Sequence, residues 1–134
     1  MQRFLILLCC LCALAACDNK TATPKATFLN TDITGSDIGR DFELTDHTGK
    51  RRSLADYRGK VVALFFGFTQ CPDICPTTLA ELAQVKKDLG ADGDKFQVLF
   101  ITLDPERDTQ DMLASFVPAF DPSFVGLRGS KAEI

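Results

Sequence analysis

The sequence predicts an α/β fold in one domain, with a pair of parallel strands in its sheet. Two continuous apolar runs, at residues 61–66 (VVALFF) and 96–103 (FQVLFITL), are typical of strands buried on both faces of a sheet. Between the runs, apolar residues recur with a period of about 3.6, which indicates a helix. Because a helix joins the two strands, they are expected to lie parallel in one sheet.

The first sixteen residues have the layout of a secretory signal peptide. In residues 1–16 (MQRFLILLCCLCALAA), Arg3 precedes an apolar run at 4–14, and small residues follow. The run is too short and too poorly flanked for a stable membrane-spanning helix. An N-terminal core helix is the alternative, but no polar residue recurs there at helical spacing. We therefore expect an exported protein.

The end of that segment indicates a lipid anchor. Residues 14–17 (LAAC) resemble a bacterial lipobox, in which Cys17 is lipidated and becomes the mature N-terminus. Asp18 resembles the signal that retains lipoproteins at the inner membrane of Gram-negative bacteria. Residues 17–27 are polar and read as a tether. We expect anchoring at the inner (cytoplasmic) membrane, facing the periplasm; ordinary cleavage with a free Cys17 is the alternative.

The folded domain is expected to cover residues 28–134 and to open with a β-hairpin. Residues 42–44 alternate between apolar and polar, residues 46–49 (DHTG) form a turn, and residues 51–54 return as the second arm. The first apolar run then follows. These elements place a small hairpin ahead of the α/β core.

The helix after the first apolar run is predicted to begin at Pro76 and to stop at Gly90. Proline favours the first helical position, and glycine favours the position just past a helix end. Its apolar positions are Leu79, Leu82, Ala83 and Leu89. The second apolar run follows it as the second strand.

The rest of the chain predicts a helix, a short strand and a further helix start. Asp108 or Thr109 can cap the helix, and residues 124–127 form the short strand. Ser130 and Glu133 have the spacing of a capping box, yet the sequence ends one residue later. We therefore expect a fold that is incomplete at the C-terminus. The inner face of the capped helix is predicted to be Leu113, Phe116, Val117 and Phe120.

Charge and cysteine use narrow the function. Without Arg3 the chain has 14 basic and 18 acidic residues and no basic stripe, which argues against nucleic-acid binding. Of six cysteines, three leave with the signal peptide and Cys17 is lipidated, so Cys71 and Cys75 remain. In an oxidising compartment this pair forms a disulfide unless it is reduced or bound to a metal.

The loop of Cys71 and Cys75 lies between a buried strand and a helix start, where backbone N–H groups favour thiolates. Such a pair can exchange disulfides, bind a soft metal such as Cu(I), or supply a peroxidatic nucleophile. A disulfide that merely pins the loop is the structural alternative. Three residues separate the two cysteines, and Pro72 and Pro76 stiffen the loop, so that copper binding and redox chemistry are about equally favoured. Zinc is less favoured, because a closed zinc site needs four ligands and this chain supplies few.

Residues 66–79 (FGFTQCPDICPTTL) look like the signature of the SCO/SenC family, the copper chaperones of cytochrome c oxidase assembly. The resemblance runs from about residue 28 to residue 134. Further segments similar to that family, in its order, are residues 32–35, 39–42, 44–49 and 104–109.

The resemblance implies a thioredoxin-like fold with an N-terminal β-hairpin extension. It also implies that Cys71 and Cys75 bind copper and deliver it to the Cu(A) centre of cytochrome c oxidase subunit II. A copper donor and a thiol reductant are the further partners implied. A family strand downstream of residue 134 is expected to pair with residues 61–66, so that this strand has an open edge here.

The third copper ligand of the family is a histidine far downstream of the cysteines. The single histidine of this sequence, His47, matches a different segment and is expected to be a solvated turn residue. Two thiolates suit Cu(I), whereas Cu(II) prefers additional nitrogen ligands and would need the missing histidine.

Other acidic residues have two readings each. Asp73 either tunes the thiols or starts a turn, and Asp104 with Arg107 either supports the cysteine loop or forms a surface ion pair. Two other functions also stay open: a thiol-disulfide oxidoreductase that reduces exported partners through Cys71 and Cys75, and a redox or copper sensor.

Overall fold

The computed structural model describes residues 29–134. The signal peptide, the lipidated Cys17 and the tether predicted for residues 1–27 lie outside the described residues. The chain divides into two compact units, Met1–Ser36 and Asp37–Ile134. In the described part of the first unit, a turn is closed by the bond from the N–H of Ser36 to the carbonyl of Ile33 (2.9 Å).

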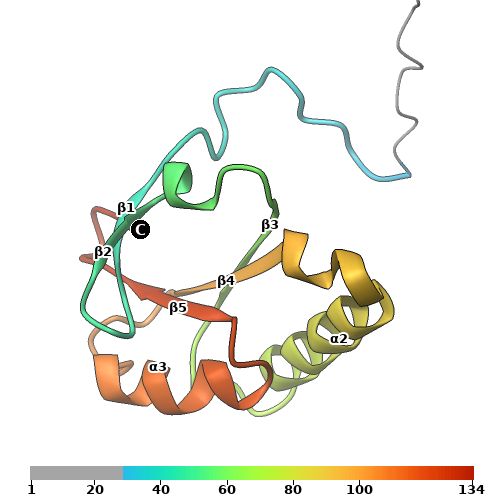
Figure 1. The fold of residues 1–134 in the computed structure, drawn as a ribbon. Helices are drawn as coiled ribbons and strands as arrows, with labels where there is room; N and C mark the ends of the chain where they lie inside the picture. Colours follow the sequence, from blue (N-terminus) through green and yellow to red (C-terminus); the bar gives the residue numbers. More distant parts are fainter. Residues whose placement is uncertain (1–28) are drawn as a thin grey trace, which may run out of the picture. The chain divides into compact units, whose positions relative to one another are not determined.

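The second unit is built on a mixed five-stranded sheet with the order β2-β1-β5-β4-β3 (Figure 1). Strands β3, β4 and β5 are parallel, whereas β1 is antiparallel to both β2 and β5. This confirms the predicted parallel pair and the N-terminal hairpin. The bounds are β1 Glu43–Asp46, β2 Arg51–Ser53, β3 Val61–Gly67, β4 Phe96–Thr102 and β5 Val125–Arg128.

Two helices connect the parallel strands, α2 (Ile74–Asp88) and α3 (Gln110–Phe116). Helix α2 begins two residues before the predicted Pro76, because Asp73 is its N-cap and first-turn N–H groups need no partner in the helix. Gly90 follows with φ +55°, as predicted for a helix stop. Short 3₁₀ turns complete the unit: η2 Leu54–Tyr57, η3 Gly90–Lys95 and η4 Val117–Ala119.

Helix α3 is shorter than the sequence predicts, since the predicted inner face extends to Phe120. It ends at Phe116, and the chain continues as η4 because Pro118 cannot donate a hydrogen bond and its ring clashes with the preceding turn. Thr109, one of the two predicted caps, accepts a bond from the N–H of Met112 (3.2 Å). The capping box at Ser130 is also formed, since Glu133 Oε2 accepts from the Ser130 N–H (2.8 Å).

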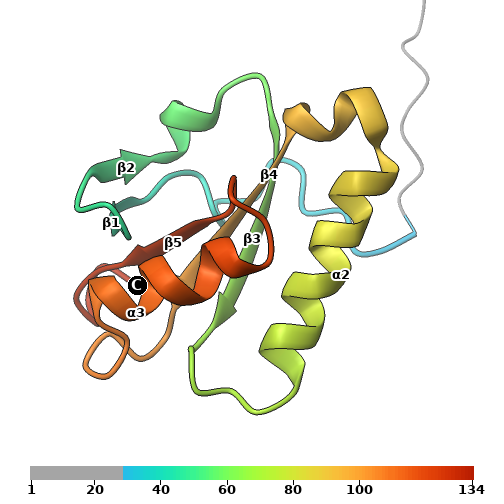
Figure 2. The same cartoon turned by 60° about the horizontal axis from the view of Figure 1, so that its bottom comes forward.

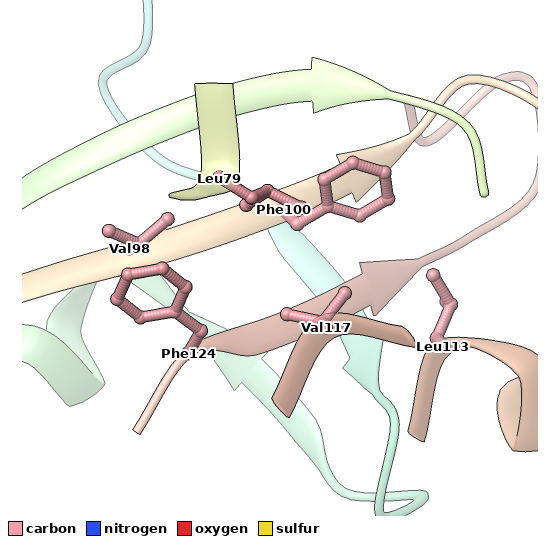
Figure 3. Close-up of a cluster of buried hydrophobic side chains, with 6 residues drawn as sticks. All are labelled: Leu79, Val98, Phe100, Leu113, Val117 and Phe124. Carbon is pink, nitrogen blue, oxygen red and sulfur yellow. The ribbon is translucent and has the colours of Figure 1, made fainter. Parts of the chain in front are cut away.

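The main core lies between the sheet and the two helices, which Figure 2 shows as ribbons. Leu79 of α2 and Leu113 of α3 meet Phe100 of β4 in one buried cluster (Figure 3). The predicted inner face is confirmed, because Leu113 and Val117 are fully buried while Phe116 and Phe120 pack against the cluster. The members of the cluster are Leu79, Val98, Phe100, Leu113, Val117 and Phe124.

The opposite face of the sheet carries a second, smaller cluster. It contains Tyr57 from η2 and side chains from β1, β4 and β5, with Ile134 packed against it. Since side chains alternate between the two faces of a strand, β4 supplies Phe100 to one cluster and Leu99 and Ile101 to the other. The buried members are Leu44, Tyr57, Leu99, Ile101 and Leu127.

The prediction that residues 61–66 form a strand buried on both faces is wrong. Strand β3 lies at the sheet edge, and Val61 and Phe66 keep 68% and 48% of their surface exposed. The run at 96–103 forms β4, an interior strand that is paired on both sides and ends one residue early at Thr102. The open edge expected for residues 61–66 is confirmed within the described residues. Within residues 29–134, no helix combines the length and apolar character needed to cross a bilayer.

Candidate thiol site

The site lies at the end of the sheet that is formed by the C-terminal ends of the parallel strands β3, β4 and β5. Cys71 sits in the turn after β3, which closes with a bond from its N–H to the carbonyl of Phe68 (3.2 Å). Cys75 is in the first turn of α2 and is buried, whereas Cys71 is half-buried. Both are free thiols. The structure therefore brings together the two cysteines that the sequence singled out.

Cys71 is the thiol that ionises more readily. Its pKa is lowered first by the hydrogen bond from the Cys75 thiol and then by the Cys75 N–H, which lies 3.4 Å from Cys71 Sγ. The N–H groups of Asp73 and Ile74 at the helix start lower it further. These donors stabilise a negative charge on Cys71 Sγ, as predicted for a helix N-terminus.

Cys75 has the opposite tendency. Burial raises the pKa of its thiol, and the hydrogen bond to Cys71 raises it further. The N–H of Phe68 opposes this shift, while the charges of Cys71 and Asp108 add to it. A half-buried, more acidic thiol beside a buried, less acidic one gives the pair a nucleophile and a resolving partner.

The close packing of Cys75 against β3 depends on Gly67. A Cβ at this position would lie 2.9 Å from Cys75 Sγ and 2.9 Å from Phe100 Cε2. Real Cβ atoms do not come so close, so any side chain here would push the cysteine or the core ring aside. Gly67 thus links the thiol to the main core.

Asp108 lies beneath the cysteine loop and was not assigned to the site from the sequence. Its side chain is buried, and Oδ2 accepts hydrogen bonds from the Thr69 N–H (2.9 Å) and the Thr102 hydroxyl (2.5 Å). Oδ1 accepts from the Thr69 hydroxyl (2.6 Å). Two sequence signals precede this arrangement: the threonines after β3 and at the end of β4, a type common in turns, and the place of Asp108 in the family-like segment 104–109.

The two acidic residues proposed as supporting groups act differently from that expectation. Asp73 is exposed, its carboxylate accepts from the Thr77 hydroxyl (3.4 Å), and only its backbone N–H acts on Cys71. Asp104 forms an ion pair with Arg107 three residues on. The Asp104 carboxylate is therefore engaged in an ion pair, whereas the Asp108 carboxylate bonds to Thr69 in the cysteine loop.

His47 lies in the hairpin turn, as the sequence predicts, but it is half-buried rather than fully solvated. Its Nδ1 accepts a hydrogen bond from the buried N–H of Gly126 in β5 (3.0 Å), and its own N–H donates to the Gly126 carbonyl (2.8 Å). The ring thus extends the pairing of β1 with β5. Among the described residues, no three or more His, Cys, Asp or Glu side chains group as metal ligands. The site therefore offers two sulfur ligands.

A dithiol at the start of a helix, directly after a parallel strand, defines this unit as a thioredoxin-like thiol domain. Residues 30–134 match the family described as SCO1/SenC. The chain belongs to the SCO1/SenC family, and its mixed sheet with helices is the family's thioredoxin-like fold.

Similar proteins come from animals and bacteria. The mitochondrial SCO2 homologue of Bos taurus is 51% identical over 96 residues, covering 70% of this chain and 36% of the relative. Copper-bound ScoI of Bradyrhizobium japonicum is 44% identical with a TM-score of 0.64, covering 69% and 59% of the two chains.

A third relative, BsSco, is described as having a disulfide switch and as a member of the Sco family of cytochrome c oxidase assembly proteins. It is 29% identical with a TM-score of 0.58, covering 69% of this chain and 56% of its own. The chain therefore spans between 36% and 59% of the length of these three proteins.

Proposed function

We propose that this protein binds copper as Cu(I) through Cys71 and Cys75 and delivers it to the Cu(A) site of cytochrome c oxidase subunit II. The observation that carries the proposal is the convergence of the two sulfurs, with Cys71 Sγ accepting from the Cys75 N–H at 3.4 Å. Membership of a family that includes a copper-bound protein and an oxidase assembly protein supports it.

The two sulfurs fit Cu(I) as cargo better than they fit Cu(II). Thiolates are soft ligands that select Cu(I), and a two-ligand site suits its low coordination numbers. Cu(II) prefers further nitrogen ligands, but Nδ1 of His47, the single histidine of the sequence, is engaged with Gly126. We expect weak Cu(I) binding and no Cu(II) site in this chain.

The test is an anaerobic titration of the reduced protein with Cu(I), against a chromophoric chelator that competes for the ion. We expect one copper per chain for the wild type, and loss of that binding in Cys71→Ala and in Cys75→Ala because each removes one of two ligands. His47→Ala is the control and should keep the wild-type stoichiometry. If neither cysteine variant changes the stoichiometry, the copper proposal is lost. A strong thiolate-to-Cu(II) band would refute the preference for Cu(I).

We further propose that the protein is held at the inner membrane through lipid on Cys17 and faces the periplasm. The lipobox-like residues 14–17 and the following Asp18 support this. Cys17→Ala is expected to move the protein from the membrane fraction to the soluble periplasmic fraction, because acyl chains can no longer be attached. Cys12→Ala is the control, since it lies in the segment that is cleaved away. Equal membrane retention of the two variants would contradict a lipid anchor.

A thiol-disulfide oxidoreductase is the second candidate, favoured by the unequal cysteines. The Cys71 thiolate attacks one sulfur of a partner disulfide, and the other partner sulfur leaves as a thiolate. Cys75 then loses its proton and attacks Cys71 Sγ, which releases the second partner thiolate. The partner gains two electrons and this chain ends with a Cys71–Cys75 disulfide, so a thiol reductant must restore it.

A further inference from the structure

The carboxylate of Asp108 is buried without a cation. Its side chain is 1% exposed, and within residues 29–134 no lysine or arginine forms an ion pair with it. Three neutral donors from Thr69 and Thr102 satisfy it instead. Burying a carboxylate costs free energy even with such bonds. The burial of Asp108 is therefore best explained by a structural role toward the residues that it binds.

What Asp108 fixes is the turn that presents Cys71. Both the N–H and the hydroxyl of Thr69 donate to the carboxylate, so the peptide and the side chain of this residue are held together. Thr69 lies inside the turn that closes between Phe68 and Cys71. The Asp108 carboxylate holds Thr69, which lies two residues before Cys71 in the chain. The position of Cys71 relative to Cys75 therefore depends on this carboxylate.

The same carboxylate ties this turn to the end of β4. Oδ2 accepts from the Thr102 hydroxyl, and the Thr102 oxygen accepts in turn from the Asp104 N–H (3.0 Å). The N–H of Asp108 itself donates to the Asp104 carbonyl (2.8 Å). The Asp108 side chain thus joins the loop after β4 to the loop after β3, in addition to the backbone bond from the Leu103 N–H to the Gly67 carbonyl (2.7 Å).

We propose that Asp108 is a positioning residue for the thiol pair: by fixing Thr69 it holds Cys71 within reach of Cys75. It thereby sets the equilibrium for closing the Cys71–Cys75 disulfide and the affinity for Cu(I). The copper half of this inference rests on the proposed function, whereas the disulfide half does not.

The decisive measurement is the exchange equilibrium with glutathione. The Cys71–Cys75 disulfide and two molecules of glutathione give two protein thiols and one glutathione disulfide, so the reaction is balanced. Asp108→Asn is expected to disfavour the protein disulfide about tenfold, a shift of about 30 mV in reduction potential, because the two sulfurs are less well aligned. Cu(I) affinity is expected to fall by about tenfold or more.

Asp46→Asn is the matched control for a purely structural effect. Asp46 is equally buried and accepts from Thr48, Lys50 and Arg52 at the hairpin turn. Strand β1 is separated from β3 by β5 and β4. This variant is expected to lower the thermal midpoint while leaving the glutathione equilibrium unchanged. Equal shifts in the two Asn variants, or no shift in Asp108→Asn, would overturn the inference.

Two substitutions of Thr69 keep the inference testable if Asp108→Asn does not fold. Thr69→Val removes the hydroxyl donor to Asp108 and keeps the shape, so it should disfavour the disulfide, whereas Thr69→Ser keeps the donor and should resemble the wild type. Identical glutathione equilibria for these two variants would refute the positioning role. A wild type that fails to bind Cu(I), together with a shifted glutathione equilibrium in Asp108→Asn, would reject the copper proposal and keep this one.

Discussion

Replacing Phe100 with alanine is expected to lower the free energy of unfolding by about 3 to 5 kcal/mol. The ring is fully buried in the main core (Figure 3). Its centroid lies 5.8 Å from the ring centroids of both Phe65 and Phe116. It also lies against Gly67, whose other neighbour is the sulfur of Cys75. The loss would therefore remove transfer free energy and leave a cavity beneath the thiol site. Urea denaturation followed by circular dichroism measures it.

Phe66→Ala is the matched control for this prediction. Phe66 is the same residue type on the neighbouring strand, but it is 48% exposed at the open edge. Its replacement should cost less than about 1.5 kcal/mol, because much of its ring is already in water. Since domains are stable by only about 5 to 15 kcal/mol, the two variants should be easy to separate. Equal losses would show that the cluster around Phe100 is not the main core.

The order of elements could be predicted from local patterns, but the position of a strand in the sheet could not. The runs at 61–66 and 96–103 are both apolar and both form strands, β3 and β4. The composition of each run shows only that the strand is apolar. Its position in the sheet depends on which other strands pair with it, and those strands come from distant parts of the chain. The pairing of β4 with β5 on one side and β3 on the other makes β4 an interior strand, and leaves β3 at the edge.

The cysteines of the site could be predicted, while the residues that hold them in place could not. Cys71 and Cys75 carry a chemistry that few residue types have, and their position before a helix is visible in the sequence. Asp104 and Asp108 both follow the end of β4, and only the turn between them decides which carboxylate points inward. His47 meets Gly126 across 79 residues, a contact without a local signal.

Replacing Asp46 with alanine is expected to cost about 2 to 4 kcal/mol of stability at pH 7. The buried carboxylate accepts from the N–H and hydroxyl of Thr48, the N–H of Lys50 and the guanidinium of Arg52 (2.7 Å). Alanine would leave these donors without an acceptor and would open the hairpin turn. The value lies below that of a fully buried ion pair because Arg52 is 26% exposed and can regain water.

The stability that Asp46→Ala loses relative to the wild type should decrease as the pH is lowered. Burial alone would raise the pKa of Asp46, but the bonds from Thr48, Arg52 and Lys50 outweigh it and hold the pKa well below its usual 3.8. The stabilisation is therefore fully present above about pH 4 and is lost as the pH falls toward the folded-state pKa. Urea denaturation at pH 7, 5, 4 and 3 should show the wild type approaching Asp46→Ala only at the acidic end.

Asp92→Ala, which removes an exposed partner of Lys95, is the control and should change stability by less than about 1 kcal/mol. A difference between wild type and Asp46→Ala that stays constant from pH 7 to pH 3 would contradict the ionised carboxylate as the stabilising group.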